Sequence, residues 1–136
     1  MQKLHFSHIN GNKIIYVGIS NRGLRSRVFY DHFIGNNSGW STLRKSLGVL
    51  ILRNPNKMPR NKNCKPHQYK FEPKDENKLT TWMKNNLILY YTIVKNPMSY
   101  EYELIEGRNP PLNINKNENI INSEFRKKLR KLRKNY

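Results

Sequence analysis

Three short apolar runs constrain the fold of this 136-residue chain more than any other feature. They cover Ile14–Gly18, Leu43–Leu52 and Leu87–Val94, and the segments between them are rich in Lys and Asn. Runs of this kind can close one modest hydrophobic core, which a wholly disordered chain lacks. None approaches the roughly 20 apolar residues that span a bilayer. The sequence therefore predicts a single small domain over residues 1–136.

Turn signals indicate a small β-sheet. Asn10-Gly11-Asn12 separates the apolar-rich runs Leu4–Ile9 and Lys13–Ile19, a pattern typical of an antiparallel hairpin. Leu87–Val94 is rich enough in β-branched and aromatic residues to form a third, buried strand. We therefore expect an α+β fold with a small, mixed, mainly antiparallel three-stranded sheet flanked by helices.

Capping residues and apolar spacing predict the helices. They are expected from Ser20 to Gly35, from Ser41 through Leu50, from Pro73 through Met83, from Pro97 to Gly107, and over about residues 122–135. In the second helix, Leu43, Leu47 and Leu50 form an apolar face, while Arg44 and Lys45 should point outward. Residues 53–73 contain several prolines and little periodicity, so we expect a long exposed loop there that helps to select the substrate.

The charge balance indicates the class of partner. With 26 Lys and Arg against 9 Asp and Glu, the chain carries a formal net charge of +17. Such an excess attracts polyanions and releases their counterions on binding, so nucleic acid is the expected partner. A solvated basic surface with no partner is the alternative. Membrane binding is not expected, because the basic C-terminal helix lacks a broad apolar face with bulky residues.

The cysteine content and the first residues of the chain indicate in which cellular compartment the protein is expected. Cys64 is a lone cysteine, which excludes an internal disulfide and a multi-cysteine zinc site. Met1–His8 lacks the apolar region of a signal peptide. We expect a soluble intracellular protein, cytoplasmic or nucleoid-associated, that acts as a monomer or as a transient dimer on DNA.

Four motifs occur along the chain in a defined order. They are Tyr16-Val17-Gly18, the Leu24-x-x-Arg27 pair, a helix carrying Glu101, and Pro110-Pro111-Leu112-Asn113. In this order they resemble the GIY-YIG endonuclease family. The stretches Tyr16–Ser20, Leu24–Arg27, Ser41–Arg44 and Pro111–Asn113 resemble its compact, stand-alone bacterial members more closely. The resemblance covers about residues 4–133 and implies a metal-dependent DNA endonuclease with one active site per chain.

The resemblance also implies roles for single residues. Glu101 would hold one Mg²⁺ or Mn²⁺, since hard cations prefer oxygen ligands and Mg²⁺ keeps several waters. Arg27 would bind a nonbridging phosphate oxygen, which a guanidinium does better than an ammonium. Tyr16 would contact or deprotonate the attacking water, and His32 is an alternative base with a reference pKa nearer neutrality. Tyr30 and Asn113 complete the candidate set, with Asn113 bracing its loop through side-chain hydrogen bonds.

Two positions depart from the family pattern. His5 stands about eleven residues before Tyr16, where the first half of the family motif places a tyrosine. Asp31 stands four residues after Arg27, where many members carry histidine. These departures motivate a second hypothesis, a catalytically silent or slow nucleic-acid-binding module on the same scaffold. A third is an RNA-associated basic protein, which explains the charge but not the motifs.

Further residues are candidates for contacts to DNA. Cations beside the motifs and in the C-terminal helix can bind phosphates, which positions a strand without reading its sequence. Trp40 can stack on a base or pack internally. The predicted contacts are Arg22, Arg25, Trp40, Arg44, Lys45, Lys127, Lys128, Arg130 and Lys131.

Overall fold

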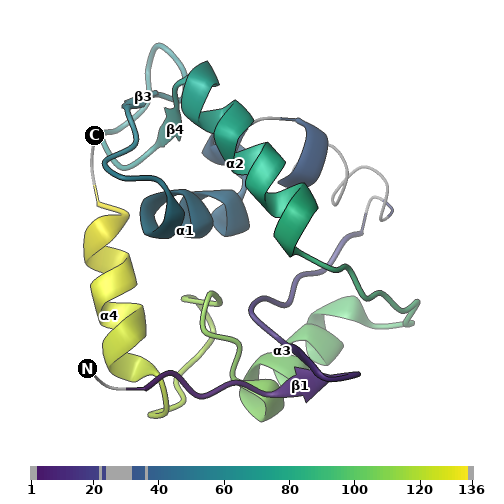
Figure 1. Ribbon diagram of the computed structural model, residues 1–136. Helices are drawn as coiled ribbons and strands as arrows, with labels where there is room; N and C mark the ends of the chain where they lie inside the picture. The colour runs from purple at the N-terminus through teal and green to yellow at the C-terminus, as the bar shows by residue number, and fades with distance from the viewer. Residues whose placement is uncertain (1–2, 22, 24–31, 36, 135–136) are drawn as a thin grey trace. The chain divides into compact units, whose positions relative to one another are not determined.

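A computed structural model describes residues 3–21, 23, 32–35 and 37–134. Contacts divide the chain into two compact units, one of Met1–Asn21 with Thr92–Arg130 and the other of Arg22–Tyr91 with Lys131–Tyr136. The elements are β1 (His8–Ile9), β2 (Asn12–Lys13), the 3₁₀ helix η2 (Ser38–Trp40), α1 (Thr42–Ile51), β3 (Lys57–Pro59), β4 (Tyr69–Phe71), α2 (Pro73–Asn86), α3 (Pro97–Arg108) and α4 (Ser123–Leu132) (Figure 1). Most of the helix predicted from Ser20 to Gly35 lies outside the described residues.

The opening hairpin is confirmed, with shorter strands than the sequence predicted. β1 and β2 pair antiparallel, with His8 opposite Lys13. Asn10 and Gly11 form the turn with φ of 47° and 77°. A two-residue hairpin turn of type I′ needs positive φ at both central positions, which Asn and Gly accept most readily.

Helix α1 begins as predicted. The Ser41 hydroxyl accepts a hydrogen bond from the Arg44 amide at 3.1 Å and caps the helix. Leu43 and Leu47 are buried, but Leu50 is 40% exposed, so its assignment to the apolar face is wrong.

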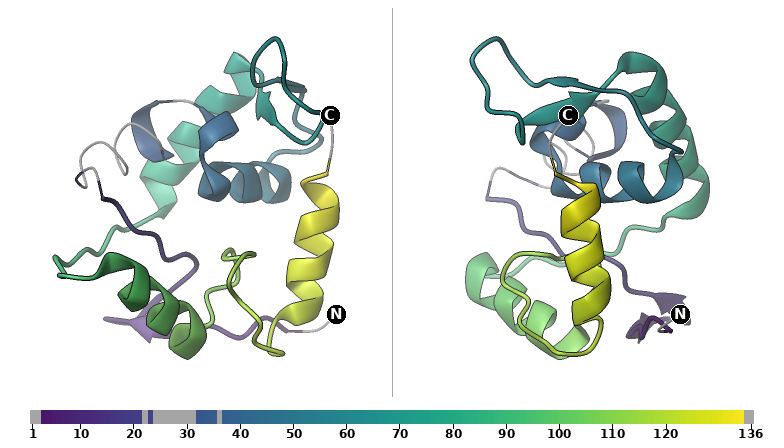
Figure 2. Two further views of the ribbon diagram at one scale, coloured as in Figure 1. Left: turned by 180° about the vertical axis from the view of Figure 1, so that it is seen from behind. Right: turned by 90° about the vertical axis from the view of Figure 1, so that its left-hand side faces the viewer.

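The long exposed loop predicted over residues 53–73 is only partly correct. It contains the antiparallel pair β3–β4, in which Met58 lies opposite Lys70. Tyr69 and Phe71, on alternate positions of β4, are 0% and 1% exposed. The loop between the strands extends away from the helices of its unit, as Figure 2 shows. Two aromatic side chains are enough to anchor a three-residue strand that periodicity over so short a window does not reveal.

A glycine in α1 makes room for that strand. A Cβ on Gly48 would lie 2.0 Å from Cε2 and 2.4 Å from Cζ of Phe71, far inside van der Waals contact. The Phe71 ring therefore packs directly on the backbone of α1. Helix α1 continues through this position to Ile51 instead of ending there.

The third strand predicted over Leu87–Val94 is absent. These residues form extended, exposed chain between α2 and α3, with Ile93 90% and Tyr91 69% exposed (Figure 1). The described residues contain two separate two-stranded sheets, so the predicted three-stranded sheet is wrong. Residues with high β-propensity become a strand only where another backbone supplies hydrogen bonds. The α+β character of the chain is confirmed.

The other predicted helices are present. α2 begins with Pro73 at its first turn, where the missing amide hydrogen costs no helical bond. α3 ends at Arg108, and its C-cap residue Asn109 adopts the left-handed conformation with φ of 46°. In the unit that contains α3, Ile105, Leu112, Ile114 and Leu129 are buried.

Candidate functional site

The side chain of Asn113 holds the backbone beside Tyr16. The Val17 amide donates to Asn113 Oδ1 at 2.8 Å, and Asn113 Nδ2 donates to the Val17 carbonyl at 2.7 Å. The Leu112 amide adds a bond to the Ile15 carbonyl at 3.0 Å. Residues 112–113 thus pair with residues 15–17 much as a neighbouring strand would. The Asn113 side chain thus links the Pro110–Asn113 motif to the Tyr16-Val17-Gly18 motif.

Tyr16 packs over the glycine of its own motif. Its ring atom Cε1 lies 3.0 Å from the position that a Cβ on Gly18 would take. The Tyr16 side chain is half-buried. A Cβ at position 18 would crowd the ring, so Gly18 leaves room for the phenol.

Glu101 lies on α3 in the same compact unit as Tyr16 and Asn113. Its carboxylate oxygen Oε2 is 3.6 Å from Lys116 Nζ, and its side chain is 13% exposed against 54% for Lys116. Lys116 sits in a turn with φ of 58°. An exposed lysine balances the charge of this carboxylate and has freedom to move away from it.

Glu101 offers one shielded carboxylate as a ligand for a hard cation. Among the residues that the structure describes, no three His, Cys, Asp or Glu side chains gather into a metal cage. Mg²⁺ is commonly held by one or two carboxylates and keeps several waters, so one shielded carboxylate matches its chemistry. Zinc, which takes three or four protein ligands, does not fit these groups.

His5 is held by a second asparagine in the same manner. The His5 amide donates to Asn122 Oδ1 at 2.9 Å, and Asn122 Nδ2 donates to the His5 carbonyl at 2.8 Å. His5 is exposed, and Asn122 is buried in the left-handed conformation with φ of 65°. The position where the family motif has tyrosine is thus fixed through its backbone, whatever its side chain.

His32 belongs to the other compact unit. It is 5% exposed, its Nδ1 lies 2.6 Å from the Ser41 hydroxyl, and its carbonyl accepts a bond from Arg44 at 2.8 Å. These contacts place it at the start of α1, within a buried polar network. Arg22, Arg25, Arg27 and Tyr30 lie outside the described residues. Of the predicted catalytic residues, Tyr16, Glu101 and Asn113 are therefore those found in one described unit.

Arg44 is the clearest correction among the predicted DNA contacts. It is 0% exposed and pairs with Glu76, which is 2% exposed, at 2.7 Å. All five of its N–H donors are used, by the Glu76 carboxylate and carbonyl, the His32 carbonyl and the Met83 sulfur. The second Glu76 oxygen accepts the Ser38 amide at 2.7 Å. Arg44 thus has no donor left for a phosphate, and the outward orientation predicted for it is wrong.

The other predicted contacts are accessible to different degrees. Trp40 is 59% exposed, with the Arg60 guanidinium 4.0 Å from the centre of its ring. Lys127 pairs with Glu124 at 2.8 Å on the surface of α4. Arg130 donates to the Ile114 carbonyl at 2.7 Å. Lys128 and Lys131 are exposed, whereas Lys45 is half-buried.

Sequence reasoning missed several buried polar residues of the unit that contains Tyr16 and Glu101. Arg126 looks like one more cation of a basic helix, yet it is 2% exposed and donates to Asn109 Oδ1 at 3.0 Å and to the carbonyls of Ile121 and Asn119. Burial, and the nearby charge of Arg130, lower the pKa of Arg126. The asparagines over residues 109–122 are the signal in the sequence for such a buried polar network, because an amide side chain can accept a hydrogen bond from a buried donor without carrying a charge.

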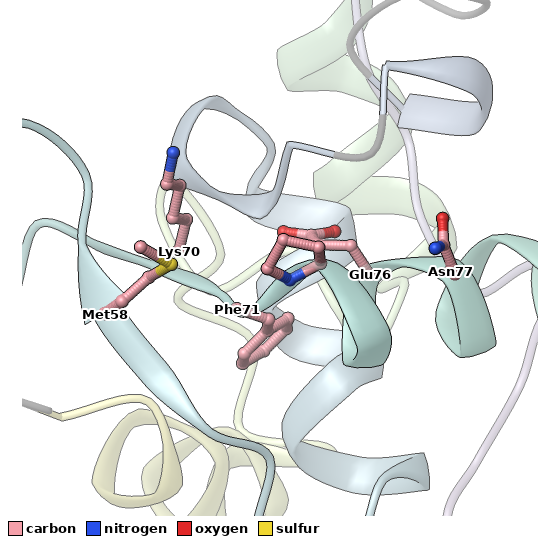
Figure 3. Close-up of a pocket in the computed structure, with 6 residues that line it drawn as sticks. Met58, Lys70, Phe71, Glu76 and Asn77 are labelled. Carbon is pink, nitrogen blue, oxygen red and sulfur yellow. The ribbon is translucent and has the colours of Figure 1, made fainter.

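The structure also contains a shallow pocket of about 280 Å³ beside α2 (Figure 3). It is lined by Met58, Lys70, Phe71, Pro73, Glu76 and Asn77. The Glu76 carboxylate is already paired with Arg44, so the pocket offers no available acid for catalysis.

Comparison with known proteins identifies the family. A family model described as the GIY-YIG catalytic domain matches residues 1–135. No curated protein and no solved structure matches the chain. None of the helices in the described part of the chain has the length and apolar character needed to span a bilayer.

Proposed function

Because the chain belongs to the GIY-YIG family of nucleases, we propose that it is a divalent-metal-dependent endonuclease that hydrolyses phosphodiester bonds in DNA. The observation that best supports this is the pair of bonds between Asn113 and Val17. They join the Tyr16-Val17-Gly18 motif to the Pro110–Asn113 motif, which lie 96 residues apart in the sequence. The net charge of +17 supports a polyanionic substrate.

The chain's own groups supply most of the chemistry in this mechanism. Arg27 binds a nonbridging oxygen of the scissile phosphate and stabilises the charge that develops there. Tyr16 orients the attacking water and takes its proton, provided that nearby positive charge lowers the pKa of the phenol. Asn113 acts as a positioning residue, because it contacts the backbone beside Tyr16 rather than the reacting atoms.

Glu101 is the residue that would hold the divalent cation. When bound, such a cation acts as a Lewis acid on the phosphate and lowers the pKa of water. Lys116 balances the Glu101 carboxylate in the structure and keeps that side chain from carrying an uncompensated charge. With one such carboxylate per chain, the expected product of one encounter is a nick.

The test is cleavage of supercoiled plasmid and of labelled single-stranded and duplex oligonucleotides in Mg²⁺, Mn²⁺ or EDTA. Glu101→Gln should lower the rate by about 10²-fold or more, because it removes the charge that holds the cation. Glu103→Gln is the matched control, since Glu103 is an exposed glutamate on the same helix. Equal cleavage by Glu101→Gln and Glu103→Gln would overturn the mechanism.

A second candidate function is nucleic-acid binding without cleavage. It is favoured by His5, where an imidazole replaces the expected phenol while the backbone stays held by Asn122. In that case DNA binds with a steep salt dependence and stays intact in every metal. His5→Tyr would then restore cutting if the missing phenol is the cause.

A further inference from the structure

Several cations of one unit gather around the buried ring of Tyr69. Lys45 Nζ lies 4.9 Å and Lys57 Nζ 4.6 Å from the centre of the ring. Lys57 also donates to the carbonyls of Leu132 and Lys134, so its ammonium has acceptors. Arg133 donates to the Ser46 hydroxyl at 3.1 Å. α1, β3–β4 and the end of the chain therefore bring their positive side chains together.

Lys45 lies among like charges. Burial and the positive charges of Arg133 and Arg60 lower its pKa from 10.5 to about 8, and the nearby Cys64 thiol acts in the opposite direction. In the described part of the chain, neither Lys45 nor Arg60 has a carboxylate partner. Half-buried cations without a counter-charge are unfavourable unless an anion joins them.

Arg60 is held in a defined orientation. Its Cγ lies 2.8 Å from where a Cβ on Gly39 would sit, so its stem packs directly on that glycine. The guanidinium then covers the Trp40 ring at 4.0 Å. Two donors next to these groups are buried without hydrogen-bond partners, the Arg60 Nε and the Tyr69 hydroxyl. Both of these atoms are buried and closed to a ligand, but the half-buried ammonium and guanidinium groups beside them can reach an anion, and phosphate oxygens are suitable acceptors for such groups.

Trp40 extends this cluster with an aromatic surface. It is 59% exposed even though Arg60 stacks on it, which leaves indole area for a base. A nucleobase can reach an exposed indole only when it is unstacked, as in a single strand. Arg60 connects the two parts, because it belongs to the cationic cluster and also contacts the ring.

We propose that Lys45, Arg60 and Arg133 bind a backbone phosphate of a single strand, and that Trp40 stacks on the adjacent base. The strand is taken as DNA, a choice that rests on the proposed function. The binding site itself is built from one compact unit and uses none of Tyr16, Glu101 or Asn113. It is therefore testable by binding alone.

The experiment measures binding of a labelled oligothymidylate and of a duplex by fluorescence anisotropy, in EDTA and across a salt series. Lys45→Gln, Arg60→Gln and Arg133→Gln should each weaken single-strand binding and lower the slope of log K against log salt, in no case by more than the roughly 0.7 that one neutralised phosphate contributes. Trp40→Ala should weaken single-strand binding about 5- to 100-fold and leave duplex binding unchanged. In a Trp82→Phe background, where Trp40 is the remaining tryptophan, its fluorescence should be quenched by the single strand.

Controls separate this inference from folding and from the proposed activity. Lys74→Gln removes an exposed cation from the start of α2 and should leave the salt slope unchanged. Lys45→Gln should fold at least as stably as the parent, because it removes a charge from among like charges. Cluster variants that match Lys74→Gln would overturn the inference, as would an equal loss of duplex binding in Trp40→Ala. If the parent binds as expected but cuts no DNA, the nuclease proposal fails and this site stands.

Discussion

The two bonds from Asn113 to Val17 allow a sharp prediction for Asn113→Ala. Each bond contributes about 1 kcal/mol, and the Val17 amide and carbonyl then lose partners at a half-buried position that water reaches only in part. Together these effects predict a loss of about 2–4 kcal/mol from the free energy of unfolding. For a chain of this size that corresponds to a fall in Tm of roughly 10 °C. Urea unfolding followed by circular dichroism measures it.

Asn122→Ala is the matched control, because Asn122 makes the same pair of bonds with the His5 backbone. Asn122→Ala should be destabilised by a similar amount plus the strain of alanine at a φ of 65°. At a temperature where both variants stay folded, however, Asn113→Ala should lose more of the cleavage rate, since its loop adjoins Tyr16. A loss of stability below about 1 kcal/mol in Asn113→Ala would refute the energetic reasoning. Equal cleavage by the two variants would refute the positioning role.

Three further predictions concern the other compact unit. Arg44→Met and Glu76→Leu should each lower the free energy of unfolding in urea by about 3–5 kcal/mol, since each leaves a buried charge unpaired. The double variant should lose much less than the sum of the two, and additive losses would contradict this reasoning. Gly48→Ala should lower the free energy of unfolding by about 1–3 kcal/mol or more, because the new methyl group overlaps the Phe71 ring. Adding Phe71→Leu to Gly48→Ala should recover part of this loss, and no recovery would count against the overlap. Lys45→Met should be more stable than the parent at pH 7, with an advantage that shrinks between pH 8 and 10.5, because the folded parent gives up its Lys45 proton there while the unfolded chain still holds it. A difference that stays constant with pH would show that the folded environment does not lower the pKa of Lys45.

Local signals in the sequence predicted the elements that local interactions stabilise. Ser41 caps α1, and Asn10-Gly11 forms the hairpin turn, because each needs only neighbouring residues. Leu87–Val94 has the composition of a strand but lacks a described partner backbone, which no local pattern can supply. Composition therefore set the propensity of this segment and left its pairing open.

In the candidate site, too, local motifs could be predicted from the sequence and long-range contacts could not. The motifs of Tyr16, Glu101 and Asn113 could be found by order and spacing, and the structure adds how Asn113 reaches back to Val17. Arg44 was misassigned because its partner Glu76 lies 32 residues away, and a helical pattern cannot distinguish a solvated arginine from a buried pair. Long-range pairing is what the sequence alone did not contain.

The hydrogen bonds between Asn113 and Val17 also affect how the protein changes chemically with age. Asparagine is a thermolabile residue, because its side-chain amide can be lost to give aspartate. In the folded chain both ends of the Asn113 amide are held by Val17, so the reactive group is protected. Each excursion to the unfolded state exposes it. Conversion to aspartate would then place an acceptor opposite the Val17 carbonyl, so the refolded loop would lose the hydrogen bond that Asn113 Nδ2 donates there.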